Sequence, residues 1–286
     1  MVTRTVPAGL GFDDHVRRLD VCGFTVIEDA LDTDLVRQAR SQIEELYRSD
    51  PGVAANRSTP TGTYHVENLA NKGRIFESFF VSNSLVVKLA ERFLGPDYIA
   101  QDVWSFGIPP HSPAYRLHSD DDVRTPGTPL SLVTIYPLVD FTADNGGTRV
   151  VPGSHWIPRY PDGPNCPGEM NIEAPAGSCV MLFGSLWHSS GANRTNAIRT
   201  SMSAYFTVPW IRQELDFSRT LSPEVLRRAT PEVRRILGLR DRAPYTERWQ
   251  WDETTGMPRP EHRATLSASG VGRCCLPDLK VHDGDR

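Results

Sequence analysis

The first part of the chain carries the hydrophobic period of amphipathic helices. In one stretch the apolar residues are Leu35, Val36, Ala39, Ile43 and Leu46. They recur at three- and four-residue intervals with charged residues between them, which predicts a helix. Asp32 or Asp34 stands before this run and can cap it. A second helix is predicted over about residues 84–94, where Gly95-Pro96 ends it. We expect both helices to lie against the outside of a sheet.

From about residue 98 the pattern changes to short β-rich runs separated by clusters of Pro, Gly, Asn and Asp. The runs are IAQDVWSFGI, LSLVTIYPLVDF, SCVMLFGSLWH and IRTSMSAYFTV. No helix-length segment alternates with them, which argues against a doubly wound parallel sheet. The pattern favours a sandwich or jelly roll. After residue 215, Ser222-Pro223 and Thr230-Pro231 predict the starts of two further helices, and Gly238 ends the second.

These runs fit one domain, a β core with additional helices at both ends. The chain has 286 residues with 39% hydrophobic content, enough for one sizeable core. We expect a single domain over residues 1–286, mainly β with flanking helices. Its parts are a helical N-terminal part at about 13–97, a β core at about 98–210, and C-terminal helices and tail at 215–286.

Charge and cysteine usage narrow the class of protein. A net charge of −4 and a pI near 6.1 argue against a nucleic-acid partner. No apolar run has the length of a signal peptide or a membrane span, so we expect a cytoplasmic protein without membrane contact. The 5 cysteines form no CxxC pair and fit a reducing compartment. Cys274 and Cys275 lie in the polar tail without an assigned role, and nothing in the sequence indicates an oligomeric state.

His118-Ser119-Asp120 is the first candidate for chemistry. In a strand, residues i and i+2 share a face, so the imidazole and the carboxylate would project together as a metal chelate requires. His188 closes the run SCVMLFGSLWH and precedes a polar turn. Two histidines and one carboxylate leave open positions on an octahedral ion, as in ferrous oxygenases. The alternative for His188 is a core histidine bonded to the backbone.

Arg199 favours the metal-site interpretation. From Ile198 to Val208 the chain alternates, and the polar face holds Arg199, Ser201, Ser203, Tyr205 and Thr207. An arginine buried on such a face is costly unless it meets an anion, and a guanidinium grips a carboxylate bidentately. Since His188 and Arg199 flank one predicted hairpin turn, we expect both to point into one cavity. The alternative is a polar face open to water.

Asn145-Gly146-Gly147-Thr148 and Pro152-Gly153-Ser154-His155 form a dense cluster of turn residues between two strand runs. The glycines suit tight or positive-φ backbone. We interpret His155 as a residue with structural hydrogen bonds rather than as a metal ligand.

Together these residues resemble the phytanoyl-CoA dioxygenase family of 2-oxoglutarate oxygenases. The shared motifs are HSD at 118–120, DNGGTRVVPGSHW at 144–156, PAGS at 175–178, and LWHSSGANRTN with Arg199 eleven residues after His188. The resemblance spans roughly residues 20–240. It implies a double-stranded β-helix of the cupin or jelly-roll type.

The resemblance also implies the cofactors and their ligands. Fe(II) would be bound by His118, Asp120 and His188, with 2-oxoglutarate and O2 as co-substrates. Arg199 would bind the C5 carboxylate of 2-oxoglutarate, and Thr148 would assist through its hydroxyl. Several relatives have a glutamine two residues before the first histidine, where this chain has Arg116. Arg116 or Gln101 is therefore the candidate for that contact.

The expected activity is oxidation, by default hydroxylation, of an unactivated C–H bond in a small secondary metabolite. Desaturation, epimerisation, ring formation or endoperoxidation would use the same oxidant. The candidate substrate-binding residues are Tyr64, His65, Asn68, Trp104, Trp187 and Tyr205. Two other classes stay open: a cupin-like metal hydrolase or isomerase, which has no need for Arg199, and a non-catalytic binding or sensor protein, for which a complete triad is unexpected.

Overall fold

The computed structural model describes residues 9–57, 62–81, 83–163 and 165–239. It also describes the backbone of two short paired strands, β10 (Trp251–Asp252) and β11 (Met257–Pro258). The predicted tail with Cys274 and Cys275 lies outside the described residues.

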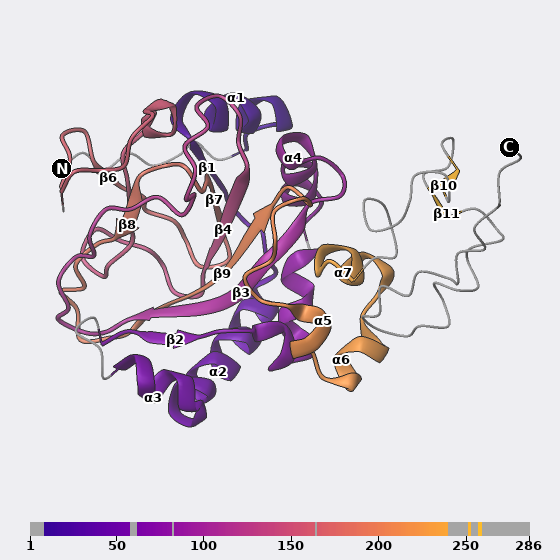
Figure 1. Ribbon diagram of the computed structural model, residues 1–286. Coiled ribbons are helices and arrows are strands. Elements are labelled where there is room, and N and C mark those ends of the chain that lie inside the picture. The colour runs from indigo at the N-terminus through magenta and orange to yellow at the C-terminus, as the bar shows by residue number, and fades with distance from the viewer. Residues whose placement is uncertain are drawn as a thin grey trace, which may run out of the picture.

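A six-stranded antiparallel sheet runs through the molecule (Figure 1). Its strands are β1 (Phe24–Ile27), β7 (Cys179–Phe183), β4 (Ser131–Pro137), β9 (Arg199–Thr207), β3 (Ile99–Ile108) and β2 (Tyr64–Val66), in that spatial order. β9 pairs with both β3 and β4 along most of its length. The sheet therefore holds β9 at its centre, where neither edge of the strand is exposed.

A smaller sheet contains β6 (Met170–Asn171), β5 (Thr148–Val150) and β8 (His188–Ser190). Residues 112–118 run antiparallel to β8 and add to the small sheet at its edge. Isolated bridges join Ser112 to Asn193 and His118 to His188. A cluster of apolar side chains fills part of the space between the two sheets, including Val133, Val150 and Leu182. Two antiparallel sheets with flanking helices form a double-stranded β-helix, which confirms the predicted fold class.

Helices cover the outer face of the large sheet (Figure 1). The N-terminal helices are α1 (Phe12–Cys22), α2 (Thr33–Ser49), α3 (Pro51–Arg57), η1 (Leu69–Asn71), η2 (Arg74–Phe80) and α4 (Ser84–Leu94). The C-terminal helices are α5 (Phe217–Thr220), α6 (Pro223–Arg228) and α7 (Pro231–Ile236). A single turn, η3 (Ser154–Trp156), lies within the β core. The Asp32 side chain caps α2, and Ser222 and Thr230 cap α6 and α7 as predicted. Together with the large sheet they enclose the main core, which includes Leu19, Ile43 and Leu89.

The alternation along β9 separates this core from the inside of the β-helix. Met202, Ala204 and Phe206 pack toward the helices, whereas Arg199 and Ser203 line a cavity between the sheets. The period of two thus predicted the faces of this strand correctly.

Two local predictions were wrong. The run of residues 178–188 is not one strand, because β7 ends at Phe183 and a turn at Gly184 carries the chain to the small sheet. β8 and β9 do not form a hairpin either, since they belong to different sheets. His188 and Arg199 nevertheless line the same cavity. The polar segment between them crosses from one sheet to the other.

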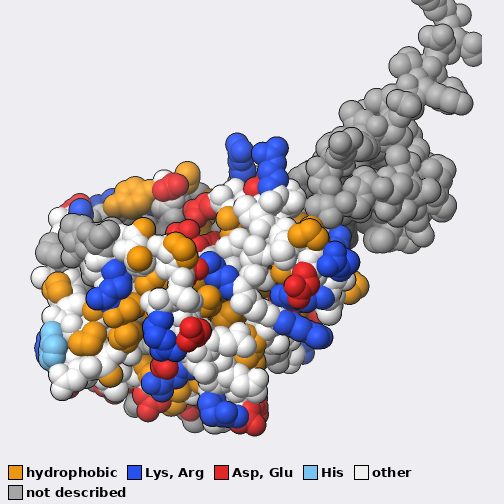
Figure 2. Space-filling view, turned by 90° about the horizontal axis from the view of Figure 1, so that it is seen from below, with side chains coloured by type: hydrophobic (Ala, Val, Ile, Leu, Met, Phe, Trp, Pro, Cys, Tyr) orange, Lys and Arg blue, Asp and Glu red, His pale blue; other side chains and the backbone are white. Residues whose placement is uncertain are grey.

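Two surface properties bear on possible partners. Among the described helices, none has the length and apolar character needed to cross a bilayer. On the face seen in Figure 2, Lys and Arg side chains are interspersed with Asp and Glu rather than gathered into a basic tract.

Candidate active site

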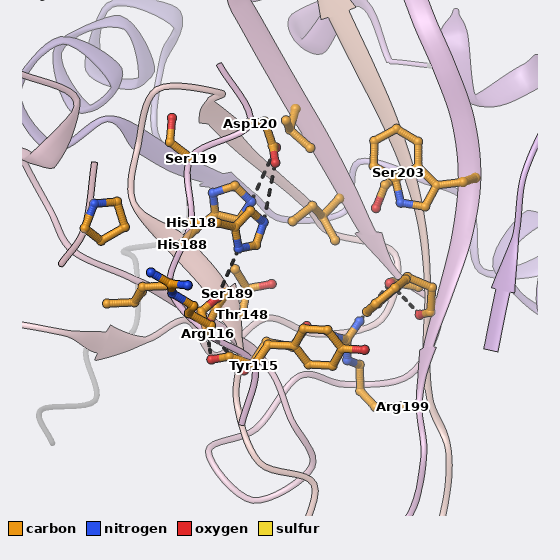
Figure 3. Close-up of a pocket in the computed structure, with 18 of the residues that line it drawn as sticks. Tyr115, Arg116, His118, Ser119, Asp120, Thr148, His188, Ser189, Arg199 and Ser203 are labelled. Atoms are coloured by element: carbon orange, nitrogen blue, oxygen red, sulfur yellow. Dashed lines mark hydrogen bonds and ion pairs between the residues drawn. The ribbon is translucent and has the colours of Figure 1, made fainter. Parts of the chain in front are cut away.

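His118, Asp120 and His188 converge at the inner surface of the small sheet (Figure 3). The Nε2 atom of His118 lies 3.4 Å from Asp120 Oδ1, and the Nε2 atom of His188 lies 3.4 Å from Asp120 Oδ2. One ligand atom from each residue lies within 4.8 Å of the other two. Neighbouring ligands on an octahedral ion with bonds of about 2.1 Å are about 3 Å apart. The three donors therefore fit one ion with small adjustments.

The backbone orients both imidazole rings toward this point. His188 Nδ1 lies 2.9 Å from the carbonyl oxygen of Leu186, and His118 Nδ1 lies 3.2 Å from that of Arg116. A carbonyl oxygen can only accept a hydrogen bond, so Nδ1 is the protonated nitrogen in each ring, and Nε2 keeps a lone pair for a metal. Burial lowers the pKa of His188, which favours the neutral form that metal binding requires.

Asp120 is placed by a turn rather than by a strand. Of residues 118–120, His118 is the one that bridges to β8, and the chain then turns so that the Asp120 N–H donates to the carbonyl of Gly184 at 2.8 Å. Arg124 braces the same turn, because its Nη1 donates to Ser119 Oγ at 2.9 Å and its Nη2 to Ile157 O at 2.8 Å. The strand-based reason for grouping residues 118 and 120 was therefore wrong, although the two side chains do meet.

Arg199 lies in the same cavity with only 3% of its surface exposed. Its Nε donates to Gly146 O at 3.1 Å, its Nη1 to Ser201 Oγ at 2.8 Å and its Nη2 to Ser190 Oγ at 2.9 Å. Its guanidinium lies 4.5 Å from the centre of the Phe141 ring. Within the described part of the chain it forms no ion pair with a carboxylate. Burial lowers its pKa to about 10, so it stays charged at neutral pH.

The buried charge of Arg199 is the feature that a dicarboxylic co-substrate would satisfy. Burying a cation without a counter-ion costs several kcal/mol, roughly the amount that a well-bonded anion returns. Gly146, whose carbonyl accepts from Arg199 Nε, needs to be a glycine, because its φ of +85° belongs to the left-handed region and a Cβ there would meet Gly191 O at 3.1 Å. The residues present thus fit both a metal ion and an acidic co-substrate.

The cavity itself has a volume of about 540 Å³. Its walls combine the triad and Arg199 with aromatic side chains of Trp104, Phe106, Tyr115 and Tyr160 and aliphatic side chains of Leu117, Val133 and Ile135. Such a mainly apolar site with a few convergent polar groups is typical of a small-molecule pocket.

Of the three further candidates for co-substrate binding, two line the cavity and one does not. Thr148 on β5 and Arg116 line the cavity, Thr148 buried and Arg116 exposed at its rim. Gln101 is not among the lining residues. It lies near the opposite end of β3 from the Arg199 pairing, where its amide donates to Thr207 Oγ1 at 2.6 Å and accepts from the Glu214 N–H at 2.7 Å. Because both ends of that amide are engaged far along the strand, Gln101 is corrected to a structural residue.

Of the candidate substrate residues, only Trp104 lines the cavity. Tyr64 packs at 5.0 Å on the Tyr47 ring, and His65 on Phe106 at 5.6 Å. The other three also lie outside the cavity lining. The Asn68 N–H donates to Asp102 Oδ1, and the Tyr205 hydroxyl donates to Asp121 Oδ1. Trp187 is buried, and its indole N–H donates to Arg159 O. Ordinary packing and hydrogen bonding explain these placements. The structural interpretation of His155 is confirmed, since Nε2 bonds to Asp20 O at 3.0 Å and the ring lies outside this cavity.

Sequence reasoning missed several lining residues, among them Tyr115, Tyr160 and Ser190. Tyr115 and Tyr160 lie in loops without any periodic signal. Ser190 lies two residues after His188, so the alternation of β8 could have placed it on the same face.

The comparison with known proteins agrees with this geometry. The family model for phytanoyl-CoA dioxygenase matches residues 19–201. The dioxygenase andF of Emericella variicolor is 29% identical over 255 residues, which cover 82% of this chain and 87% of that protein. The multifunctional dioxygenase ausE of Aspergillus calidoustus is 26% identical over 265 residues, covering 84% and 88% respectively.

Solved structures share the fold at lower identity. The epimerase SnoN, in complex with Fe3+, alpha ketoglutarate and nogalamycin RO, matches with a TM-score of 0.58 and 19% identity, covering 72% of this chain and 88% of SnoN. HygX from Streptomyces hygroscopicus, with nickel and 2-oxoglutarate bound, matches with a TM-score of 0.57 and 15% identity, covering 70% and 88%.

The β-helix, the triad and the buried arginine together define an iron- and 2-oxoglutarate-dependent dioxygenase. More narrowly, the chain belongs to the phytanoyl-CoA dioxygenase family. Membership in this family decides against the hydrolase and the non-catalytic alternatives.

Proposed function

We propose that this dioxygenase hydroxylates an unactivated C–H bond of a small secondary metabolite in natural-product biosynthesis. His118, Asp120 and His188 hold Fe(II), and Arg199 holds the C5 carboxylate of 2-oxoglutarate. The observation that carries the proposal is the burial of Arg199 without a described carboxylate partner, in the cavity that also holds the triad. A metal hydrolase would have no use for such an arginine.

The bound iron supplies the oxidising chemistry, in which O2 converts 2-oxoglutarate to succinate and CO2 and leaves one oxygen atom for the substrate. The protein positions the metal ligands and the co-substrate. Its two histidines present Nε2 because their Nδ1 protons are held by backbone carbonyls. Arg199 fixes the far end of the co-substrate by a charge-assisted bond. Thr148, which lies beside Ser190 across β5 and β8, adds a hydroxyl to this end of the cavity.

The remaining walls favour an apolar substrate. Trp104, Phe106 and Ile135 present mainly hydrocarbon surface to the cavity. The structural relatives support a natural product as the substrate class, since the structure of SnoN holds nogalamycin RO and one structure of HygX holds hygromycin B.

The same site serves other outcomes if the substrate lies differently. Among the structural relatives, SnoN is an epimerase, and SnoK, also from nogalamycin biosynthesis, is a carbocyclase. Epimerisation, ring formation and desaturation are therefore alternative outcomes on the same scaffold. Hydroxylation is the simplest, because the oxygen atom is delivered to the carbon that lost its hydrogen.

The proposal is tested with purified protein stripped of metal by a chelator. Without oxygen, adding Fe(II) and 2-oxoglutarate should produce a weak visible absorption band. Admitting oxygen in the presence of a panel of natural products should then release succinate and add one oxygen atom to the accepted substrate. Absence of both the band and succinate under every metal condition contradicts the cofactor assignment. Succinate formation with a dehydrogenated, cyclised or epimerised product would keep the cofactors and replace hydroxylation.

A further inference from the structure

Tyr115 combines a tightly held backbone with an unpartnered hydroxyl. Its N–H donates to Ser190 O at 3.0 Å, and its carbonyl accepts from Arg149 Nη2 at 2.7 Å and from Ser189 Oγ at 3.1 Å. The phenol oxygen, by contrast, is buried and has no hydrogen-bond partner among the described residues. A buried hydroxyl without a partner costs about 1–3 kcal/mol. Such a group in a cavity is a place where a ligand atom is expected.

The hydroxyl shares its surroundings with Arg199. Both residues line the cavity, and both are bonded to Ser190, whose carbonyl accepts from the Tyr115 N–H while its hydroxyl accepts from Arg199 Nη2. In Figure 3 the Tyr115 ring extends from the side of the triad toward Arg199. Its edge lies against Phe106, with 5.7 Å between the ring centres. The contact with Phe106 and the backbone hydrogen bonds of Tyr115 together limit how the ring can turn.

Arg149 explains why this placement is rigid. It lies opposite Ser189 in the pairing of β5 with β8 and is not among the residues that line the cavity. Its guanidinium bonds Ser189 Oγ and the Tyr115 carbonyl, and it forms a buried ion pair with Glu169 at 2.6 Å. The segment that carries Tyr115 toward His118 is thus tied to the small sheet by side-chain and backbone bonds together.

We propose that the Tyr115 hydroxyl donates a hydrogen bond to the distal carboxylate of the co-substrate beside Arg199. This rests on the proposed function, because it assumes that Arg199 binds 2-oxoglutarate. Arg199 uses one N–H on each of its three nitrogens for protein acceptors, which leaves one N–H on each terminal nitrogen. A carboxylate has about four lone-pair positions, so two guanidinium bonds leave room for a further donor. The phenol is that donor.

The test compares two probes that differ only in the distal carboxylate: 2-oxoglutarate and 2-oxobutanoate. Binding of each to the nickel-loaded enzyme is measured by calorimetry, without turnover. Tyr115→Phe removes the hydroxyl and keeps the ring. We expect it to weaken 2-oxoglutarate about 10-fold, the effect of one hydrogen bond to a charged group, and to leave the affinity for 2-oxobutanoate unchanged.

Tyr160→Phe is the matched control, because Tyr160 lines the same cavity but its hydroxyl already donates to Asp121 O at 3.2 Å. It should not change the preference for 2-oxoglutarate over 2-oxobutanoate. Equal weakening of both probes by Tyr115→Phe would show a merely structural role and overturn the proposal, as would no weakening of either. If the wild type itself does not prefer 2-oxoglutarate, the assignment of Arg199 fails instead, which keeps the two failures distinct.

Discussion

The guanidinium of Arg149 lies 2.6 Å from the carboxylate of Glu169, and their side chains are only 4% and 6% exposed. Arg149 follows Thr148 in β5, and Glu169 precedes β6. The pair therefore joins the small sheet to the loop that includes Tyr160, one of the cavity walls. Because both side chains are buried, removing either charge would leave the other buried without a counter-ion.

Replacing Glu169 by Gln should lower the free energy of unfolding by about 3 kcal/mol. Loss of one partner of a buried ion pair leaves the other charge uncompensated, which typically costs about 3–5 kcal/mol, and the amide oxygen can still accept one bond. The change is measured by urea denaturation of the wild type and the variant.

Asp162→Asn provides the comparison, since Asp162 pairs with Arg159 in the same loop but the two side chains are 82% and 56% exposed. A surface pair of this kind contributes about 0–1 kcal/mol. If both variants change the stability by the same small amount, the Arg149–Glu169 pair does not hold the loop to the small sheet.

Arg199→Leu should raise the concentration of 2-oxoglutarate needed for half-maximal turnover by at least about 10-fold, because a charge-assisted bond contributes about 1.5–3 kcal/mol. The metal affinity should stay close to that of the wild type, since no triad atom is removed. Both quantities are measured on one preparation, by steady-state succinate release and by metal titration.

Arg194→Leu is the control for this substitution. Arg194 lies five residues earlier, 68% exposed, and its partner Asp144 is also at the surface. The co-substrate requirement of this variant should match that of the wild type. Loss of metal from Arg199→Leu without a change in co-substrate demand would contradict the role assigned to Arg199.

The parts of the fold with a repeating pattern could be predicted from the sequence. The helix at 84–94 and the strand at 99–108 were placed at their observed bounds, because each has a sustained period and a clear stop. The triad was predicted from the HSD motif together with His188, and the resemblance to a known family assigned these residues to iron. Arg199 was found because it stands on the polar face of an otherwise alternating strand.

The rest depends on contacts that no local pattern records. Tyr115 lines the cavity because a segment without regular structure pairs with β8, and that pairing is visible only in the folded chain. Gln101 has the right residue type and lies on a cavity strand, but its position along that strand puts it beside Thr207. Distance along a strand, at about 3.3 Å per residue, decided against it.

His15 gives the protein a stability that depends on pH. Its Nδ1 lies 2.8 Å from Thr25 Oγ1, and both side chains are buried where α1 packs on β1. Burial lowers the pKa of His15, and Arg18 lowers it further, while Asp14 opposes them. The folded pKa is thus below the unfolded value of about 6.5. The unfolded chain binds more protons in this range, so stability is complete above about pH 6.5 and is lost as the pH falls.

We therefore expect the wild type to lose stability relative to a His15→Asn variant between about pH 7.5 and pH 5.5, because only the wild type must keep His15 neutral in the folded state. Asparagine offers an oxygen near the position of Nδ1 but cannot become charged. Other groups titrate in this range in both proteins, because burial lowers the pKa values of His65 and His155 and raises the pKa of Asp102 to about 7, so the prediction concerns the difference between the two slopes. Denaturant unfolding at several pH values measures both slopes. Equal slopes would mean that His15 takes up its proton as readily in the folded protein as in the unfolded chain, which a histidine closed off between a helix and a strand should not do.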